Sequence, residues 1–151
     1  MQAMSRDRFP VVVHVLLLRS VRSDAEVFLL RRSGTGFMDG WHVLPGGHVH
    51  AGEGLEEAAV RECREETGVA PTELHALCML PYRSGRHQGI NVVFEAGQLD
   101  GEPRLGEPER SDLAAWFTLS RLPQPVAPWL ADVLELRGRG EWFRELHWRP
   151  P

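Results

Sequence analysis

The sequence has few cysteines and no long apolar run. Its two cysteines, Cys63 and Cys78, are too few for the disulfide framework of a small secreted domain, so we expect both to be packed as thiols in a reducing cytoplasm. The apolar segment Val11–Leu18 is much shorter than the ~20 residues of a transmembrane helix. No small-residue cleavage site follows it, which argues against a secretory signal peptide. We therefore expect a cytoplasmic protein without a membrane partner.

The charge balance lacks the basic excess of proteins that bind nucleic acids. The formal net charge is -4 at pH 7, which argues against nucleic acid or an anionic membrane as the main partner. The 151 residues include 42% hydrophobic and 25% charged residues, a composition typical of a globular domain with one core. We expect a flexible arm over residues 1–9 and a single domain over residues 10–151.

The most informative segment is LPGGHVHAGEGLEEAAVRECREETGV, residues 44–69. It begins with the pair Gly46-Gly47, which we predict forms a tight turn, because glycine lets the backbone bend close to a ligand. The segment after this glycine pair is dense in acids and from Leu55 contains no helix breaker until Gly68, so it predicts a helix. The apolar stripe of this helix that should pack inward consists of Leu55, Ala58, Ala59 and Cys63.

Three glutamates share one face of this helix. Glu65 and Glu66 follow Glu62 by three and four residues, and Glu62 and Glu66 lie within roughly 20° of the line through Leu55. Like charges on a half-buried surface repel one another and are costly to desolvate. A hard divalent cation such as Mg²⁺ removes this cost, and substrate phosphates would complete its coordination. The glutamates therefore indicate a metal site beside the apolar stripe.

A solvated acidic helix without a metal would show the same run of charges, so the glutamates alone leave both interpretations open. Arg61 is spaced four residues from both Glu57 and Glu65, and it can fix the orientation of a glutamate. The full pattern is Gly47, five residues, Glu53, seven residues, then RECREETGV. This pattern resembles the signature of the Nudix hydrolases of the MutT-like kind. Only the cysteine within it departs mildly from the family, which more often has a larger aliphatic residue there.

The resemblance implies a loop-helix-loop catalytic motif and a role for each matching residue. Arg61 would orient the glutamates, and Glu53 would support the site from behind the metal ligands or at a second metal position. We choose Glu62 as the general base, although related enzymes take this base from different places. The implied cofactor is Mg²⁺, with Mn²⁺ as a substitute. The implied metal ligands are the Gly46 carbonyl, Glu62, Glu65 and Glu66.

Before the motif, the sequence predicts a β-hairpin. Pro10–Leu18 is rich in branched residues and predicts a central strand, in which His14 should be a packed core histidine. We expect a polar connection over residues 19–26 and a second strand over Val27–Arg32. Trp41–Leu44 predicts a short strand that leads into the glycine pair.

Two arginines, Arg31 and Arg32, end the second strand and lead into the glycine-rich loop Ser33–Gly40. Two guanidinium groups beside a flexible loop predict an anion-binding site. In proteins of the family that resemble this one, the arginine that matches Arg32 lies near the substrate. We therefore take both arginines as candidate substrate-binding residues.

After the motif, Leu74–Tyr82 and Gly89–Ala96 predict two antiparallel strands, and Asp112–Leu119 predicts a third. The loop before the third strand is rich in acids. In many related enzymes an acid before the tryptophan of this strand contacts the metal or the base, and the sequence does not choose among the candidates. These candidates are Glu107, Glu109 and Asp112, the last two of which we include as substrate-binding residues.

The last part of the chain predicts a helix and an aromatic tail. Pro125–Leu136 has the spacing of an amphipathic helix with proline in its first turn, and Gly138 and Gly140 should end it. The tail EWFRELHWRPP contains two tryptophans and one phenylalanine. Because this is much aromatic surface to leave in water, we expect it to pack against the domain or to form the contact of a homodimer.

This order of elements predicts the α/β class, with a mixed sheet between helices in an α/β/α sandwich. The Nudix resemblance implies the same architecture. It also implies an enzyme that hydrolyses phosphoanhydride bonds in a nucleoside diphosphate linked to another group. We favour a (deoxy)nucleoside triphosphate that yields a monophosphate and pyrophosphate, and the alternative is ADP-ribose or a nucleotide sugar. A nucleotide-binding module without catalysis is the alternative of another class, which the intact glutamates disfavour.

Overall fold

Branched residues near the start of the chain form a β-hairpin in the computed structural model, which describes residues 6–147. β1 (Val11–Val21) and β2 (Asp24–Arg32) pair antiparallel, with Val21 opposite Asp24. The predicted hairpin is confirmed, but the polar connection predicted over residues 19–26 is wrong. Polar residues continue both strands beyond the core, so that only residues 22 and 23 connect them.

The other elements follow in the predicted order. The remaining strands are β3 (His42–Val43), β4 (Gly46–His48), β5 (Pro71–Ser84), β6 (His87–Leu99), β7 (Ser111–Thr118) and β8 (Leu146–His147). The helices are α1 (Leu55–Thr67), α2 (Trp129–Arg139) and the short 3-10 helix η1 (Leu119–Arg121). No helix within residues 6–147 combines the length and apolar character needed to cross a membrane.

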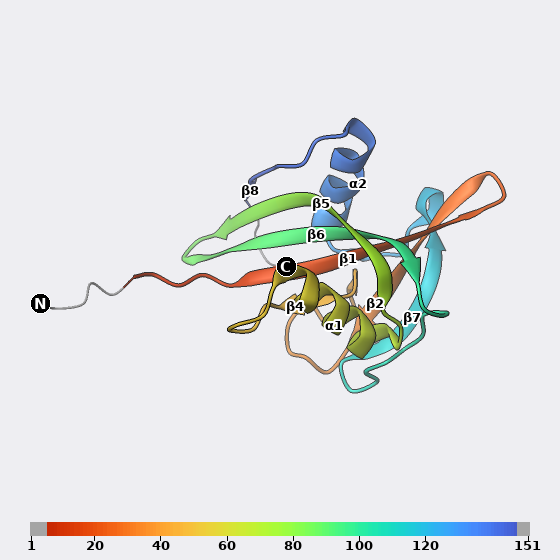
Figure 1. The fold of residues 1–151 in the computed structure, drawn as a ribbon, viewed down its shortest axis with the longest axis horizontal. Helices are drawn as coiled ribbons and strands as arrows, with labels where there is room; N and C mark the ends of the chain where they lie inside the picture. The colour runs from red at the N-terminus through yellow and green to blue at the C-terminus, as the bar shows by residue number, and fades with distance from the viewer. Residues whose placement is uncertain (1–5, 148–151) are drawn as a thin grey trace, which may run out of the picture.

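The sheet is mixed, as predicted. Its strand order is β3-β2-β1-β6-β5-β8, with β4 paired to β1 and β7 paired to β2. β1 runs parallel to β6, whereas β5 and β6 form a long antiparallel hairpin. Figure 1 shows α1 and α2 on opposite faces of this sheet. The α/β/α sandwich predicted from the sequence is therefore confirmed.

Alternation along the central strand produces a core on each face of the sheet, because successive side chains of a strand point to opposite sides. Val13, Val15 and Leu17 of β1 pack in one core, which includes Ala58, Ala59 and Cys63 of α1. Leu16 packs in the other core, which includes Leu130, Val133 and Leu136 of α2. Both cysteines are buried free thiols, as predicted. Each helix is thus anchored by its own apolar stripe.

Three local predictions are wrong. Gly46-Gly47 is not a turn but part of β4, because its backbone pairs with β1. Leu55 does not belong to the inward stripe, since it lies in the first turn of α1 with 39% of its surface exposed. The C-terminal helix starts at Trp129 instead of Pro125, and Gly138 lies inside it, so that Gly140 alone ends it with φ at 66°.

The C-terminal tail returns to the sheet with its backbone but leaves two aromatic side chains in solvent. β8 pairs with β5, and Phe143 forms a bridge to Met79. Trp142 and Phe143 are nevertheless 66% and 47% exposed. Of the two predicted alternatives, packing against the domain does not hold for these two side chains, and the homodimer contact stays a prediction. Trp148 lies outside the described residues.

Candidate active site

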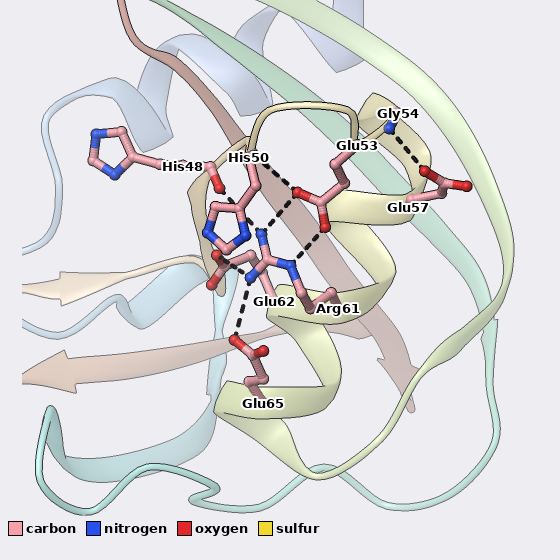
Figure 2. Close-up of polar contacts among 8 residues, drawn as sticks. All are labelled: His48, His50, Glu53, Gly54, Glu57, Arg61, Glu62 and Glu65. Carbon is pink, nitrogen blue, oxygen red and sulfur yellow. Dashed lines mark hydrogen bonds and ion pairs between the residues drawn. The ribbon is translucent and has the colours of Figure 1, made fainter.

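Helix α1 is delimited by glycines at both ends. Gly54 precedes its first turn, and the backbone N–H of Gly54 donates to the Glu57 carboxylate at 2.8 Å. The predicted Glu57–Arg61 pair is therefore wrong, because Glu57 binds the start of the helix (Figure 2). Gly68 ends the helix with φ at 73°, a conformation that residues with a side chain rarely adopt. The two ends of α1 determine where along the helix the glutamates of the motif lie.

The glycine pair lets β4 approach α1 closely. The Gly46 N–H donates to Glu66 Oε2 at 2.8 Å. A Cβ atom at Gly47 would collide with the carboxylate of Glu62. The glycines thus bring backbone close to the site, as predicted, although they do so from a strand.

The carbonyl of Gly46 faces away from β1. Hydrogen bonds join Val15 N to Pro45 O and Val49 N to Val11 O, so the ladder between β1 and β4 uses these alternate residues. Gly46 lies opposite His14, between the bonded positions. In an antiparallel ladder the N–H and C=O of such a residue point away from the paired strand. The Gly46 carbonyl is therefore available on the side where its N–H meets Glu66.

Arg61 joins the acidic side chains of the motif, as Figure 2 shows. Its guanidinium donates to both carboxylate oxygens of Glu53, at 2.6 and 3.0 Å. It also donates to Glu62 at 2.7 Å and to Glu65 at 3.2 Å, and it binds the carbonyl of His48 at 3.1 Å. The geometry thus brings the predicted orienting arginine together with three of the predicted acids.

The hydrogen bond to Arg61 has an electrostatic consequence for Glu53. Together with a bond from the backbone N–H of His50, it lowers the pKa of Glu53 to about 2. Glu53 in turn raises the pKa of Arg61, so the pair stays charged throughout the physiological range. Because Glu53 stays ionised, its carboxylate holds the guanidinium of Arg61 in place.

Glu66 has the opposite environment. Burial raises its pKa to about 8, and the charges of Glu62 and Glu107 act in the same direction, against the hydrogen bond from Gly46. In this environment the carboxyl of Glu66 holds a proton at neutral pH. A positive ion at this position would favour its charged form.

The donor atoms here fit a hard divalent cation. Glu62, Glu66 and the Gly46 carbonyl provide oxygen, and the raised pKa of Glu66 marks a carboxylate without enough neutralising charge. Within residues 6–147, however, no three His, Cys, Asp or Glu side chains are gathered closely enough to hold an ion as they stand. Glu62 and Glu65 are instead turned onto Arg61. The assignment of the Gly46 carbonyl, Glu62, Glu65 and Glu66 as metal ligands therefore remains a prediction. It requires the side chains of Glu62 and Glu65 to turn away from Arg61.

A cavity of about 190 Å³ opens beside Gly46 and Glu66. Its polar residues include Arg32 and Arg110, and its other walls come from β1, β3, β5, β6 and α2. Its lining consists of Val12, His14, Arg32, Phe37, Met38, Val43, Leu44, Gly46, Gly47, His48, Glu66, Tyr82, Asn91, Arg110, Trp129 and Leu146. The cavity thus joins the acidic motif to a largely apolar space.

Of the two predicted arginines, only Arg32 reaches this cavity. Its guanidinium is held by the Phe37 carbonyl at 2.8 Å and by the Thr35 hydroxyl at 3.0 Å, and burial lowers its pKa. Arg31 instead forms a two-bond pair with Asp112, at 2.7 and 3.1 Å, on the exposed surface. The structure therefore does not bring Arg31 or Asp112 to the cavity.

The acidic loop before β7 contributes one acidic residue, Glu107, and one basic residue, Arg110, to the surroundings of the site. The charge of Glu107 interacts with the cluster: its pKa is raised chiefly by burial and further by the charges of Glu109, Glu65 and Glu62. Glu109 is exposed and does not line the cavity. Arg110 lines the cavity, although no spacing and no motif in the sequence pointed to this residue. All 17 basic residues of the chain are arginines, so composition could not single it out.

Comparisons with known proteins agree with the motif. Residues 8–136 match the model of the NUDIX domain. An ADP-ribose pyrophosphatase of Methanocaldococcus jannaschii is 36% identical over 106 residues, which cover 69% of this chain and 61% of that protein. An oxidized purine nucleoside triphosphate hydrolase of Danio rerio is 32% identical over 91 residues, which cover 59% of this chain and 56% of that protein.

A solved structure shares the fold along most of the chain. The crystal structure of a MutT NUDIX hydrolase from Burkholderia pseudomallei superposes with a TM-score of 0.75 at 30% identity, and the match covers 85% of this chain and 98% of that one. The fold, the motif and these matches define a NUDIX domain. The chain belongs to the Nudix hydrolase family. It spans less than two thirds of the length of either relative named above.

Proposed function

We propose that this protein hydrolyses the diphosphate linkage of a nucleoside diphosphate derivative. The observation that carries the proposal is the juxtaposition of the Arg61 network with a cavity that holds Glu66 and two arginines. The motif acids occupy one side, where a cation and a diphosphate can meet. Arg32 and Arg110 occupy the cavity itself, where anionic oxygens need donors.

The proposed metal ligands are the Gly46 carbonyl, Glu62, Glu65 and Glu66. Bound Mg²⁺, or Mn²⁺ in its place, would neutralise charge on the diphosphate and acidify the attacking water. The close contact of Gly47 with Glu62 limits where that carboxylate can lie. Arg61 donates to one of its oxygens in the structure. Once Glu62 turns to hold the cation with one oxygen, its other oxygen would be left to accept a proton. Glu62 is therefore the proposed general base, and Glu53 holds Arg61 in place.

Two substrate classes follow from the relatives. The sequence analysis favours a (deoxy)nucleoside triphosphate, and the name of the D. rerio relative supports this class. The name of the M. jannaschii relative supports ADP-ribose, which would yield AMP and a sugar phosphate. A Mg²⁺-dependent assay with deoxynucleoside triphosphates, oxidised dGTP, ADP-ribose and sugar nucleotides separates them. Pyrophosphate is released only from the triphosphates.

The same assay tests the alternative of a silent nucleotide-binding module. Turnover of any member of the panel that depends on Glu62 supports an enzyme. Binding of nucleotides with no turnover under Mg²⁺ or Mn²⁺ would contradict it. We also propose a cytoplasmic protein, since both thiols are free and buried.

A homodimer remains part of the proposal. Trp142 and Phe143 lie side by side, with ring centroids 5.4 Å apart, and expose much of their surface. Exposed aromatic pairs of this kind mark interaction surfaces. Light scattering on the protein and on a Trp142→Ser variant would test it, because a dimer built on this pair should dissociate in the variant.

A further inference from the structure

The loop between β2 and β3 is closed by hydrogen bonds to the carboxylate of Asp39. Oδ1 accepts from the Thr35 hydroxyl at 2.6 Å and from the Thr35 N–H at 3.1 Å. Oδ2 accepts from the Gly36 N–H at 3.0 Å. These bonds, first of all the one from the Thr35 hydroxyl, lower the pKa of Asp39. Asp39 is therefore a charged acceptor at neutral pH.

The Thr35 hydroxyl connects this carboxylate to Arg32. A hydroxyl can donate its single proton and accept at the same time. Its proton goes to Asp39, since the other acceptor in reach, the Phe37 carbonyl, lies farther away at 3.0 Å. Its oxygen can then accept from Nη2 of Arg32, also at 3.0 Å. A chain of two hydrogen bonds thus joins the Asp39 carboxylate to the guanidinium.

The guanidinium of Arg32 is held at two points. Nε donates to the Phe37 carbonyl at 2.8 Å, and Nη2 donates to Thr35. A guanidinium has five N–H groups, so three of them have no partner within residues 6–147. Arg32 lines the cavity, whereas Thr35 and Asp39 do not. The uncommitted N–H groups therefore belong to a fixed, planar donor at the cavity, which suits the oxygens of a phosphate.

Backbone bonds fix the ends of the same loop. The Gly40 N–H donates to the Arg32 carbonyl at 2.7 Å. The Ser33 N–H donates to the carbonyl of Arg110, the second arginine of the cavity, at 2.9 Å. The loop that holds the side chain of Arg32 is thus also bonded to the backbone that carries Arg110.

We propose that Thr35 and Asp39 are positioning residues, which hold the guanidinium of Arg32 in the orientation that binds phosphate oxygens of the substrate. This inference rests on the proposed function, since it concerns the phosphates of the same nucleotide. A free arginine side chain would lose its conformational freedom only when the substrate binds, at a cost in affinity. Bonds that fix the side chain beforehand remove this cost, so they should lower KM and leave kcat unchanged.

A kinetic test uses Thr35→Val, which keeps the shape of the side chain but removes the hydroxyl. KM should rise by about tenfold with kcat unchanged. Thr35→Ser keeps the hydroxyl and should keep KM. Asp39→Asn offers one acceptor oxygen where the carboxylate offers two, so one donor of the loop meets an amide N–H. Its KM should rise by about threefold or more.

Asp24 provides the matched control, because its carboxylate has similar partners. It accepts from the Ser120 hydroxyl at 2.5 Å and from the Ala25 N–H at 2.8 Å. Asp24 begins β2, whereas Arg32 ends it, and neither Asp24 nor Ser120 lines the cavity. Asp24→Asn and Ser120→Ala should therefore leave KM unchanged.

A double-mutant cycle separates positioning from stability of the loop. Thr35→Val should add little to the KM of an Arg32→Gln variant, because both changes act through one guanidinium. An unchanged KM in Thr35→Val overturns the inference. A rise in KM that persists in full without Arg32 also overturns it, because the hydroxyl would then act on the loop alone.

Two measurements do not require hydrolysis. In ¹H–¹⁵N spectra of arginine side chains, a held guanidinium rotates slowly about its Nε–Cζ bond and gives separate Nη1 and Nη2 signals. Arg32, assigned by comparison with Arg32→Gln, should behave in this way in the unmodified protein and in Thr35→Ser, but not in Thr35→Val. Calorimetry with Mg²⁺ and the α,β-methylene analogues of ADP and dGTP should show about tenfold weaker binding by Thr35→Val.

These measurements separate the inference from the proposed function. Equal rotation and equal affinity in Thr35→Val and the unmodified protein would remove the role of Thr35, even if nucleotides are hydrolysed. A released guanidinium and weaker binding in Thr35→Val, without turnover of any nucleotide by the unmodified protein, would support the inference and contradict the proposed function. Binding of neither analogue by the unmodified protein overturns the inference, because Arg32 would then bind no phosphate.

Discussion

Substitution of Gly47 by alanine should disable the site without unfolding the protein. An ideal Cβ at this position lies 2.5 Å from Cδ and 2.6 Å from Oε2 of Glu62, whereas ordinary contacts begin at 3.4 Å. The backbone of β4 is held by its pairing with β1, so the carboxylate must move. It can do so, because it is the far end of a flexible side chain. Gly47→Ala thus displaces the proposed general base and changes no other group directly.

The size of the effect follows from the displacement. The carboxylate must shift by about 1 Å to restore ordinary contact, and a misplacement of this size costs about 10²-fold in rate. We expect kcat to fall by this factor and KM to change less, since the added methyl group meets Glu62, which does not line the cavity. The thermal midpoint should stay close to that of the unmodified protein.

The assay compares kcat for Gly47→Ala with that for Gly138→Ala, which adds the same methyl group. Gly138 lies within α2 with nothing within 4 Å of its ideal Cβ, so alanine there should preserve activity and stabilise the helix. In a Glu62→Gln background, Gly47→Ala should add little further loss, because both act through one carboxylate. Full activity of Gly47→Ala, or a loss that adds fully to that of Glu62→Gln, would refute the reasoning.

Three further predictions concern the same site. Glu62→Gln should lower kcat by about 10²- to 10⁴-fold with an intact fold, and unchanged turnover would remove Glu62 from the mechanism. Because the pKa of Glu66 is raised to about 8 from its ordinary 4.5, the folded state retains a proton that the unfolded state loses. The free energy of unfolding in EDTA should therefore fall as pH rises from about 5 to 8, and urea titrations of Glu66→Gln should lack this fall. Arg32→Gln and Arg110→Gln should each raise KM by about tenfold or more, whereas Arg31→Gln, whose side chain is paired outside the cavity, should leave KM unchanged. Equal effects at all three arginines would show that only net charge matters.

The features that the sequence predicted well depend on neighbours along the chain. Glu62, Glu65 and Arg61 lie within one turn of each other, and helical geometry alone brings them together. Branched residues likewise predict β1 and β2 through their local preference and alternation. The prediction of two helices around a mixed sheet followed from the order of such segments.

Other features depend on which segments meet in space. Arg31 and Arg32 are adjacent in sequence but point to opposite sides of β2, and only the finished sheet shows which side holds the cavity. Arg110 reaches that cavity from a loop, and no local pattern marks it. Pairing with β1 also turns the glycine pair into a strand.

By itself, the sequence determined the acidic helix, its arginine and the family, because a helix places residues three and four apart on one face whatever surrounds it. Only the tertiary structure decided which arginines meet the cavity and that His14 lies in its wall, bonded to Asn91. These depend on contacts such as His14 with Asn91, 77 residues apart, and the register of the sheet that brings them together is a property of the whole fold.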